Sequence, residues 1–472
     1  MKKLLLVFLL VLFLPIAAAQ EIPQKKEKKD SRKEILNQVE SFKKSVSGIR
    51  GKKFRKDFGV GIKTKGELEK YILAQTEKPE FVEEMDKAKK VLVKLGLIEP
   101  KLDLTKIMVD MLTEQVAGFY DPEKSELFLM EQNIGTPMQD MVLAHEIFHA
   151  LQDQYYHIDA MMQVIHHNDD LGLALKSIIE GEATLGGLEY MFAKNGSSVL
   201  NMPVDIGKML YEQAKLGQQA NPNSALAKAP KFIQEMLFFS YGYGSSFVQQ
   251  YLAKHSSWKT LDNLFENPPL STEQIMHPDK YIKQIDYPVK IHLPLLHERL
   301  KGEWKEVITS NMGEFQTRIM LAEFIDEETS EKAARGWDGD AYILIESAEK
   351  EGASIFGWLS VWDTEKDAEE FAKACAGMFE KRFGANALKT ENGYALKDKN
   401  SDETAFIEYA GTEVLVILGA PDSILAQVRA ELLKSRQVIV KEAKFGALSE
   451  NKTSIPRQGD EEEKEESPAR DF

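Results

Sequence analysis

Two histidines and a glutamate in the segment LAHEIFHALQDQ, residues 143–154, have the types and the spacing of a catalytic metal site. His145, Glu146 and His149 form the pattern H-E-x-x-H. On a helix, residues i and i+4 lie one turn apart on the same face, so both imidazoles could bind one ion. Glu146 would lie beside that ion and could accept a proton from a water molecule that the ion activates. The pattern also arises by chance, so two histidines on a packed helix are the alternative.

A third ligand decides between these interpretations, because catalytic zinc usually has three protein ligands and one open position. The metzincin pattern needs a histidine six residues after His149, but that residue is Tyr155. The downstream segment SIIEGEATLGGLEYM places Glu180 and Glu182 on a second expected helix, among small and apolar residues. We expect one of the two to complete a His-His-Glu site. The alternative is that both glutamates face solvent.

The pattern H-E-x-x-H, followed about thirty residues later by E-G-x-A on a helix, resembles the gluzincin metallopeptidases. Five segments in order are similar to the peptidase-MA-like group of exported gluzincins, over roughly residues 36–285: EQVAGFYDPEKSELFL, LAHEIFHALQDQYY, EGEATL, YGYGSSFVQQYL and STEQIMHPDKY. The resemblance implies one Zn²⁺ per chain, bound by His145, His149 and Glu180. It places Glu182 behind the ligands or facing the substrate.

The resemblance also implies a group that stabilises the oxyanion. In related aminopeptidases this is a tyrosine in a Y-x-x-G pattern after the third ligand. The segment SYGYGSSF places Tyr241 and Gly244 on that pattern, with Tyr243 close by. Core packing is the alternative role for Tyr241. His277, in STEQIMHP, is a second candidate donor.

The helix that carries H-E-x-x-H has clear start signals. Thr136 is expected as the N-cap, Pro137 suits the first helical position and Gln139 would complete a capping box. Before it, two short strands are expected at Val116–Tyr120 and Glu126–Met130. In the resembling fold, the edge strand of this sheet lies beside the cleft and pairs with an extended peptide.

The order of the expected helices and strands along the chain predicts an α+β protein with two domains. Helical patterns from about residue 36, with the small sheet, indicate a mainly helical catalytic domain over residues 36–285. Strand patterns such as DAYILIE, SIFGWLSVW, TAFIEYA and TEVLVILGA then alternate with two helical segments. They indicate a C-terminal α+β domain over 286–447. A charged linker is expected at 20–35 and a disordered acidic tail at 448–472.

The N-terminus predicts export. The segment MKKLLLVFLLVLFLPIAAAQ has two lysines, an apolar run and three alanines, which is typical of a signal peptide over residues 1–19. The mature protein would be periplasmic or extracellular, without stable membrane insertion. An uncleaved anchor is the alternative. With Cys375 as its single cysteine, the chain has no intrachain disulfide, and its net charge of −15 argues against a nucleic-acid partner.

These features together predict an exported zinc-dependent metallopeptidase that acts on a peptide or protein substrate. Zinc aminopeptidases read the substrate N-terminus through a G-x-M-E-N type motif, which the sequence lacks, so an endopeptidase is favoured. The rival class is a non-catalytic envelope protein for binding or assembly on the same scaffold. The intact Glu146 favours the enzyme, because a protein without catalysis needs no general base there.

Overall fold

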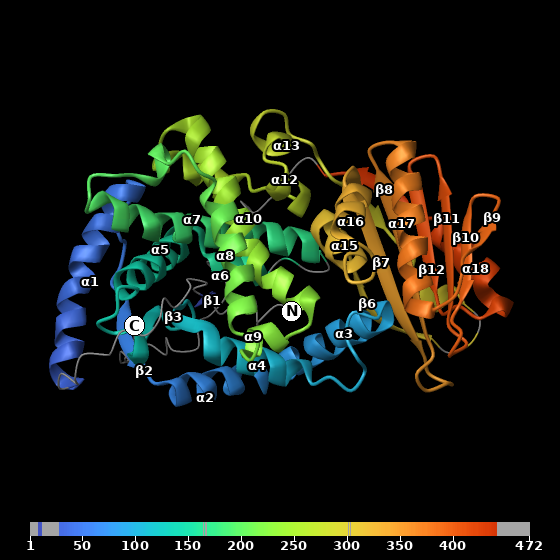
Figure 1. The fold of residues 1–472 in the computed structure, drawn as a ribbon, viewed down its shortest axis with the longest axis horizontal. Coiled ribbons are helices and arrows are strands. Elements are labelled where there is room, and N and C mark those ends of the chain that lie inside the picture. The colour runs from blue at the N-terminus through green and yellow to red at the C-terminus, as the bar shows by residue number, and fades with distance from the viewer. Residues whose placement is uncertain are drawn as a thin grey trace, which may run out of the picture.

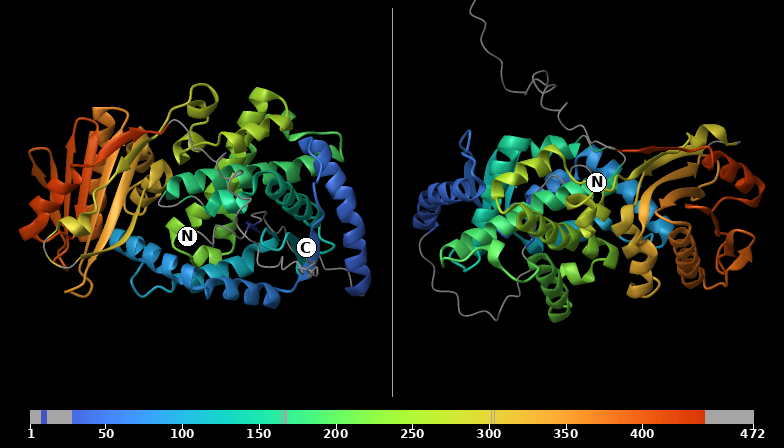
Figure 2. Two further views of the ribbon diagram at one scale, coloured as in Figure 1. Left: turned by 180° about the vertical axis from the view of Figure 1, so that it is seen from behind. Right: turned by 90° about the horizontal axis from the view of Figure 1, so that it is seen from above.

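The computed structural model describes residues 8–11, 28–163, 165, 168–300, 302 and 304–440. The acidic tail, most of the predicted signal peptide and the first half of the predicted linker lie outside the described residues. A helical part and a sheet part lie side by side along the longest axis (Figure 1), and two other views show the same arrangement (Figure 2). The α+β fold class is therefore confirmed.

Three long helices form the centre of the helical part, in which α7 packs between α5 and α10. Glycines allow the close approach on both sides of α7. A Cβ on Gly186 would overlap the ring of Phe148 on α5, and a Cβ on Gly181 would overlap the carbonyl group of Gly244 on α10. The helices of this part are α1 (Lys28–Arg50), α2 (Lys65–Thr76), α3 (Pro79–Leu95), α4 (Leu104–Gln115), α5 (Gln139–Tyr156), α6 (Ile158–Gln163), α7 (Asp169–Ala193), α8 (Ile206–Ala220), α9 (Ala225–Lys228), α10 (Lys231–His255), α11 (Asp262–Glu266), α12 (Thr272–Met276) and α13 (Asp279–Ile282), with short 3-10 turns at Glu131–Asn133, Val199–Asn201 and Trp258–Leu261.

A four-stranded sheet lies against α5, in the order β1-β3-β4-β2. Both predicted strands are confirmed as β3 (Val116–Asp121) and β4 (Glu126–Met130), which pair antiparallel. The third strand, β2 (Gly59–Lys63), pairs parallel with β4 and was not predicted. The fourth, β1 (Phe8–Val11), belongs to the predicted signal segment and pairs antiparallel with β3.

The sheet part contains seven antiparallel strands in the order β6-β7-β8-β12-β11-β10-β9. Side chains alternate between its two faces, so Trp358 and Val416 pack with α17, while Leu415 and Ile417 pack with α18. A two-stranded ribbon of β5 and β13 lies beside this sheet. The elements are β5 (Val289–His292), α14 (Leu296–Arg299), β6 (Trp304–Ser310), α15 (Gly313–Leu321), α16 (Glu327–Ala334), β7 (Trp337–Ser347), β8 (Ser354–Trp362), α17 (Glu365–Phe383), β9 (Leu388–Thr390), β10 (Gly393–Lys397), β11 (Thr404–Ala410), β12 (Glu413–Leu418), α18 (Asp422–Leu432) and β13 (Arg436–Ile439).

The two parts are packed together rather than merely tethered. The largest hydrophobic cluster contains residues of both, and the rings of Phe239 on α10 and Phe315 on α15 have centroids 4.0 Å apart. Helix α3 reaches from the helical part to the sheet (Figure 1). There Lys90 Nζ donates to Glu346 at 2.9 Å and Lys94 Nζ donates to the carbonyl oxygen of Ser354 at 2.8 Å.

Two predicted helix starts are wrong. Helix α5 begins at Gln139, and its predicted capping box is absent because the hydroxyl of Thr136 donates to the carbonyl oxygen of Asn133, at 2.8 Å. The side chain of Gln139 accepts instead from the backbone N–H of Gly135, also at 2.8 Å. Helix α1 begins at Lys28, inside the predicted linker, and its charged segment KKDSRKE precedes the first buried apolar residue, Ile35.

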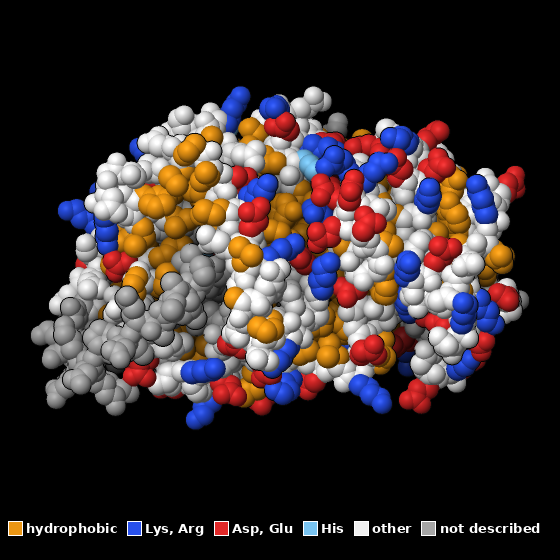
Figure 3. All heavy atoms as spheres, in the orientation of Figure 1, with side chains coloured by type: hydrophobic (Ala, Val, Ile, Leu, Met, Phe, Trp, Pro, Cys, Tyr) orange, Lys and Arg blue, Asp and Glu red, His pale blue; other side chains and the backbone are white. Residues whose placement is uncertain are grey.

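The surface carries mixed charge. On the face in Figure 3, acidic and basic side chains alternate where the helical part meets the sheet. In the described part of the chain, no helix is both long enough and apolar enough to cross a membrane.

Candidate metal centre

His145, His149 and Glu180 converge on one point. The Nε2 atoms of the two histidines lie 2.9 Å apart, and Oε2 of Glu180 lies 3.4 Å from each of them. The three side chains are at most 1% exposed. A tetrahedral zinc ion with bonds of about 2.0–2.1 Å has ligand atoms about 3.3 Å apart. The triangle therefore has the dimensions of three ligands around one ion.

Unpartnered buried atoms around this triangle also fit a metal site. Within the described residues, both carboxylate oxygens of Glu146, both of Glu180 and Nδ1 of His145 are buried without a hydrogen bond of normal geometry. A buried polar atom without a partner costs roughly 1–3 kcal/mol. Five such atoms around one point are expected where an ion and water complete the site. The donor set of two imidazoles and one carboxylate suits Zn²⁺.

Burial and neighbouring groups tune the protonation of these residues. Burial, reinforced by His149, lowers the pKa of His145 to about 4, which keeps the ring neutral as a metal ligand requires. Burial alone would raise the pKa of Glu180, but the two neighbouring histidines bring it below its ordinary value. Burial, and then the charge of Glu180, raise the pKa of Glu146 well above its ordinary value. Such a carboxyl group is suited to holding and returning a proton.

Strand β3 crosses directly over the face of α5 that carries Val142 and Glu146. A Cβ on Gly118 would lie 2.7 Å from Cγ1 of Val142 and 3.5 Å from Cγ of Glu146, so glycine allows this approach. One edge of β3 pairs with β4 and the other with β1. In a chain that has lost residues 1–19, the second edge would be open to an extended peptide.

Glu182 does not belong to the triangle. Its carboxylate accepts hydrogen bonds from Arg50 and from Gln152, on the side of α7 that faces α5 and the end of α1. The prediction that Glu180, rather than Glu182, completes the ligand set agrees with this geometry. Arg50 was missed, because nothing in the sequence signals a contact between residues 132 positions apart. Gln152 was also missed, although its position three residues after His149 on the same helix could have signalled the contact.

The two tyrosines of α10 have different surroundings. Tyr243 accepts a hydrogen bond from Arg318 at 3.0 Å and stacks on Phe239, so it faces α15. Tyr241 is 6% exposed and belongs to the main core. It lies one turn before Gly244, whose backbone contacts the helix that carries Glu180.

His277 is not brought to the triangle. Its Nε2 lies 2.9 Å from Oε1 of Glu314 on α15. The ring lines a different cavity, of about 590 Å³, and the described residues around that cavity include none of the three ligands. Beside this cavity, the ammonium group of Lys280 lies 2.5–3.1 Å from the carboxylates of Glu273, Asp286 and Asp363. It occupies the position that a metal ion would take among these three groups.

Sequence reasoning also missed Lys176, the single charged side chain in the segment LGLALKSII. It lies one helical turn before Glu180 on the same side of α7. Burial lowers its pKa, and the charge of Glu180 opposes that effect. Lys176 therefore places an amino group on the side of α7 that carries Glu180.

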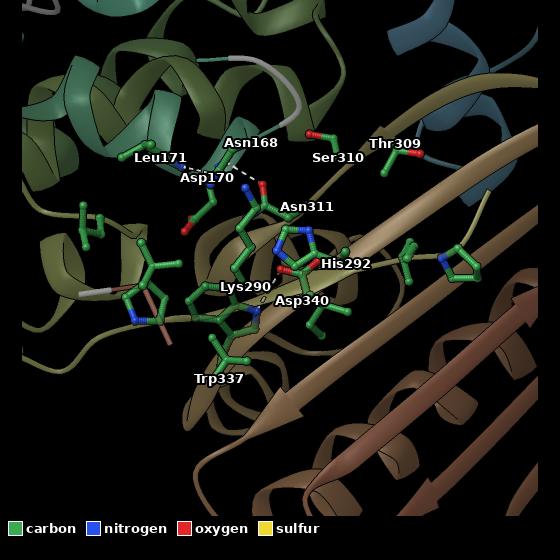
Figure 4. Close-up of a pocket in the computed structure, with 18 of the residues that line it drawn as sticks. Asn168, Asp170, Leu171, Lys290, His292, Thr309, Ser310, Asn311, Trp337 and Asp340 are labelled. Carbon is green, nitrogen blue, oxygen red and sulfur yellow. Dashed lines mark hydrogen bonds between the residues drawn. The ribbon is translucent and has the colours of Figure 1, made fainter. Parts of the chain in front are cut away.

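A second cavity, of about 390 Å³, lies where the two parts meet (Figure 4). Lys290 and His292 extend into it from β5 (Figure 4). Asp170 accepts two hydrogen bonds from Thr272, at 2.5 and 3.0 Å. Burial raises the pKa of Asp170 to about 8, and the charge of Asp340 adds to the effect.

Asp340 is fully engaged in holding that junction. It accepts hydrogen bonds from two backbone N–H groups and two indole N–H groups: Met312, Gly313, Trp337 and Trp358. These four contacts all lie within the sheet part, whereas the backbone N–H of Asp170 donates to Oδ1 of Asn311 at 3.2 Å and so links the helical part to it.

Comparisons with known proteins cover only the sheet part. A family model described as "Domain of unknown function (DUF8575)" matches residues 298–429. No curated protein and no solved structure matches the chain. The candidate metal centre lies outside the matched segment.

Proposed function

We propose that this protein is an exported, zinc-dependent metallopeptidase. The observation that supports the proposal best is the buried triangle of His145, His149 and Glu180, with the unpaired carboxyl group of Glu146 beside it. A structural zinc site is closed by four protein ligands. Here three ligand atoms converge, and the fourth neighbour is a glutamate with the position of a general base.

Each residue of the site has a separate role in the proposed hydrolysis. Zinc, when bound, would lower the pKa of a water molecule towards 7 and polarise the substrate carbonyl group. Glu146 accepts the proton of the attacking water and returns it to the leaving amine. Tyr241 is the preferred oxyanion donor of the two candidates, because its helix packs on the helix of Glu180, whereas His277 is engaged by Glu314.

Substrate binding follows from the position of β3. Its edge runs beside Glu146, and an extended peptide paired with that edge would lie across the metal centre. Residues 8–11 occupy the edge as β1 in the full chain. Removal of the signal peptide during export would therefore open the substrate edge. Pairing with a strand binds an extended peptide along its length, which favours an endopeptidase.

The test combines metal content with hydrolysis of a mixed peptide library by the mature protein. Glu146→Gln should keep about one zinc per chain and lose roughly 10²–10⁴-fold in rate, because an amide cannot accept the proton. Glu212→Gln, on the exposed side of α8, is the matched control and should be unaffected. Equal hydrolysis by wild type and Glu146→Gln would refute the assigned base. A zinc-loaded wild type that hydrolyses nothing would favour the binding or assembly protein.

A further inference from the structure

A buried chain of hydrogen bonds leads from His149 to the end of helix α1. Nδ1 of His149 donates to Oε1 of Gln152 at 2.8 Å. Nε2 of Gln152 donates to Oε2 of Glu182 and to the carbonyl oxygen of Ile179, both at 3.0 Å. The other oxygen of Glu182 accepts from Nε of Arg50. Arg50, Glu182 and Gln152 are at most 2% exposed.

The contacts of Gln152 fix the direction of its amide group. Glu182 and the carbonyl of Ile179 can only accept, so they require the NH₂ group on their side. The amide oxygen must then face His149, which places the ring proton on Nδ1. The lone pair of His149 is consequently on Nε2, the atom that faces His145 and Glu180. A reversed amide would set oxygen against two acceptors.

Arg50 holds Glu182 in this arrangement from a different element. Its guanidinium also donates to the carbonyl oxygen of Trp258 and to the hydroxyl of Tyr156, both at 2.9 Å, and lies 2.7 Å from Asp262. Arg50 is the last residue of α1. The chain of contacts therefore ties α1, α7 and the segment after α10 to one metal ligand.

We propose that Arg50, Glu182 and Gln152 are positioning residues that hold His149 in its metal-binding tautomer and orientation. Partners of this kind typically change metal affinity by about 10–100-fold. The inference rests on the proposed metal site but not on peptide hydrolysis, so its test measures zinc binding.

The first variant pair compares two buried glutamines of α5. Gln152→Leu keeps the size of the side chain and removes the partner of His149. Gln154→Leu is the matched control, because its amide is also buried but bonds to the backbone of residues 55 and 56. Competition with a chromophoric chelator should show zinc affinity about 10–100-fold weaker in Gln152→Leu and within about threefold of wild type in Gln154→Leu. Unchanged affinity in Gln152→Leu, or equal losses in both, would overturn the proposal.

Glu182→Gln tests the same chain of hydrogen bonds without changing the size of the side chain. It is the decisive variant if Gln152→Leu does not fold. Its new NH₂ group opposes that of Gln152, so the amide direction is no longer determined. Nitrogen NMR of the zinc-free protein should show neutral His149 with its proton on Nδ1 in wild type. In the variant it should show a mixture of the two neutral tautomers, with the proton on Nδ1 in one and on Nε2 in the other. Zinc affinity should fall, and the loss in the double variant should be less than the sum of the single losses. The proposal would be contradicted if Glu182→Gln kept the wild-type tautomer and zinc affinity, or if the affinity losses of the two single variants added up in the double variant.

Discussion

Gly181 lies between Glu180 and Glu182 at a close contact of α7 with α10, and Gly181→Ala tests whether that contact sets the geometry of the candidate metal site. A Cβ there would lie 2.5 Å from the carbonyl carbon of Gly244 and closer to its oxygen. Carbon atoms in contact prefer separations of about 3.5–4.0 Å. The two helices must therefore separate by about 1 Å, because the obstacle is backbone that cannot rotate away.

Two losses are expected from that displacement. Overpacking of a core typically costs about 1–3 kcal/mol of unfolding free energy. Functional geometry tolerates about 0.5 Å, so a shift of about 1 Å should also move Glu180 away from the two histidines and weaken zinc binding. Stability and zinc affinity should fall together.

Urea unfolding of the zinc-free protein, together with zinc titration, measures both effects. Gly217→Ala is the matched control, because this glycine is also within a helix, α8, but nothing lies within 4 Å of its added Cβ. That variant should gain about 0.5–1 kcal/mol and keep its zinc affinity. If Gly181→Ala is as stable as wild type and binds zinc equally well, the close packing of α7 on α10 does not position Glu180.

Three further outcomes are expected. Burial holds the pKa of Asp170 near 8, against an ordinary value of 3.8, so the unfolding free energy falls as pH rises between these values. Asp170→Asn removes that loss. The melting temperature of this variant, measured relative to wild type at the same pH, should therefore be higher at pH 9 than at pH 5. Tyr241→Phe should lower kcat by about 10²–10³-fold with zinc retained, while His277→Gln should change kcat little; the reverse result would exchange their roles. N-terminal sequencing of the exported protein should begin near Gln20, and a chain that still begins at Met1 in the membrane fraction would favour an anchor.

Local spacing was sufficient to predict part of the candidate metal centre. The i, i+4 rule brings His145 and His149 together whatever the rest of the fold, and their Nε2 atoms are 2.9 Å apart. The choice between Glu180 and Glu182 came from a resemblance. The structure gives a geometric reason for that choice. Residues two apart on a helix point about 200° apart, so only one of the two glutamates can face the triangle.

Contacts between distant segments could not be predicted. The ion pair of Arg50 with Glu182 depends on how α1 docks, and the pairing of His277 with Glu314 depends on how α15 packs on α12. The predicted cap of α5 is wrong for a local reason, because the hydroxyl of Thr136 donates to the carbonyl oxygen of Asn133 in the preceding turn. A capping box does form at the start of α2, where Thr64 and Glu67 lie within one turn of each other.

The most direct test of the central claim is peptide hydrolysis by the mature protein before zinc removal, after chelation and after zinc is restored. The account predicts about one zinc per chain, loss of hydrolysis with the metal, and recovery in proportion to the zinc that rebinds. Full hydrolysis by the zinc-free protein, or none with one zinc bound per chain, would contradict it.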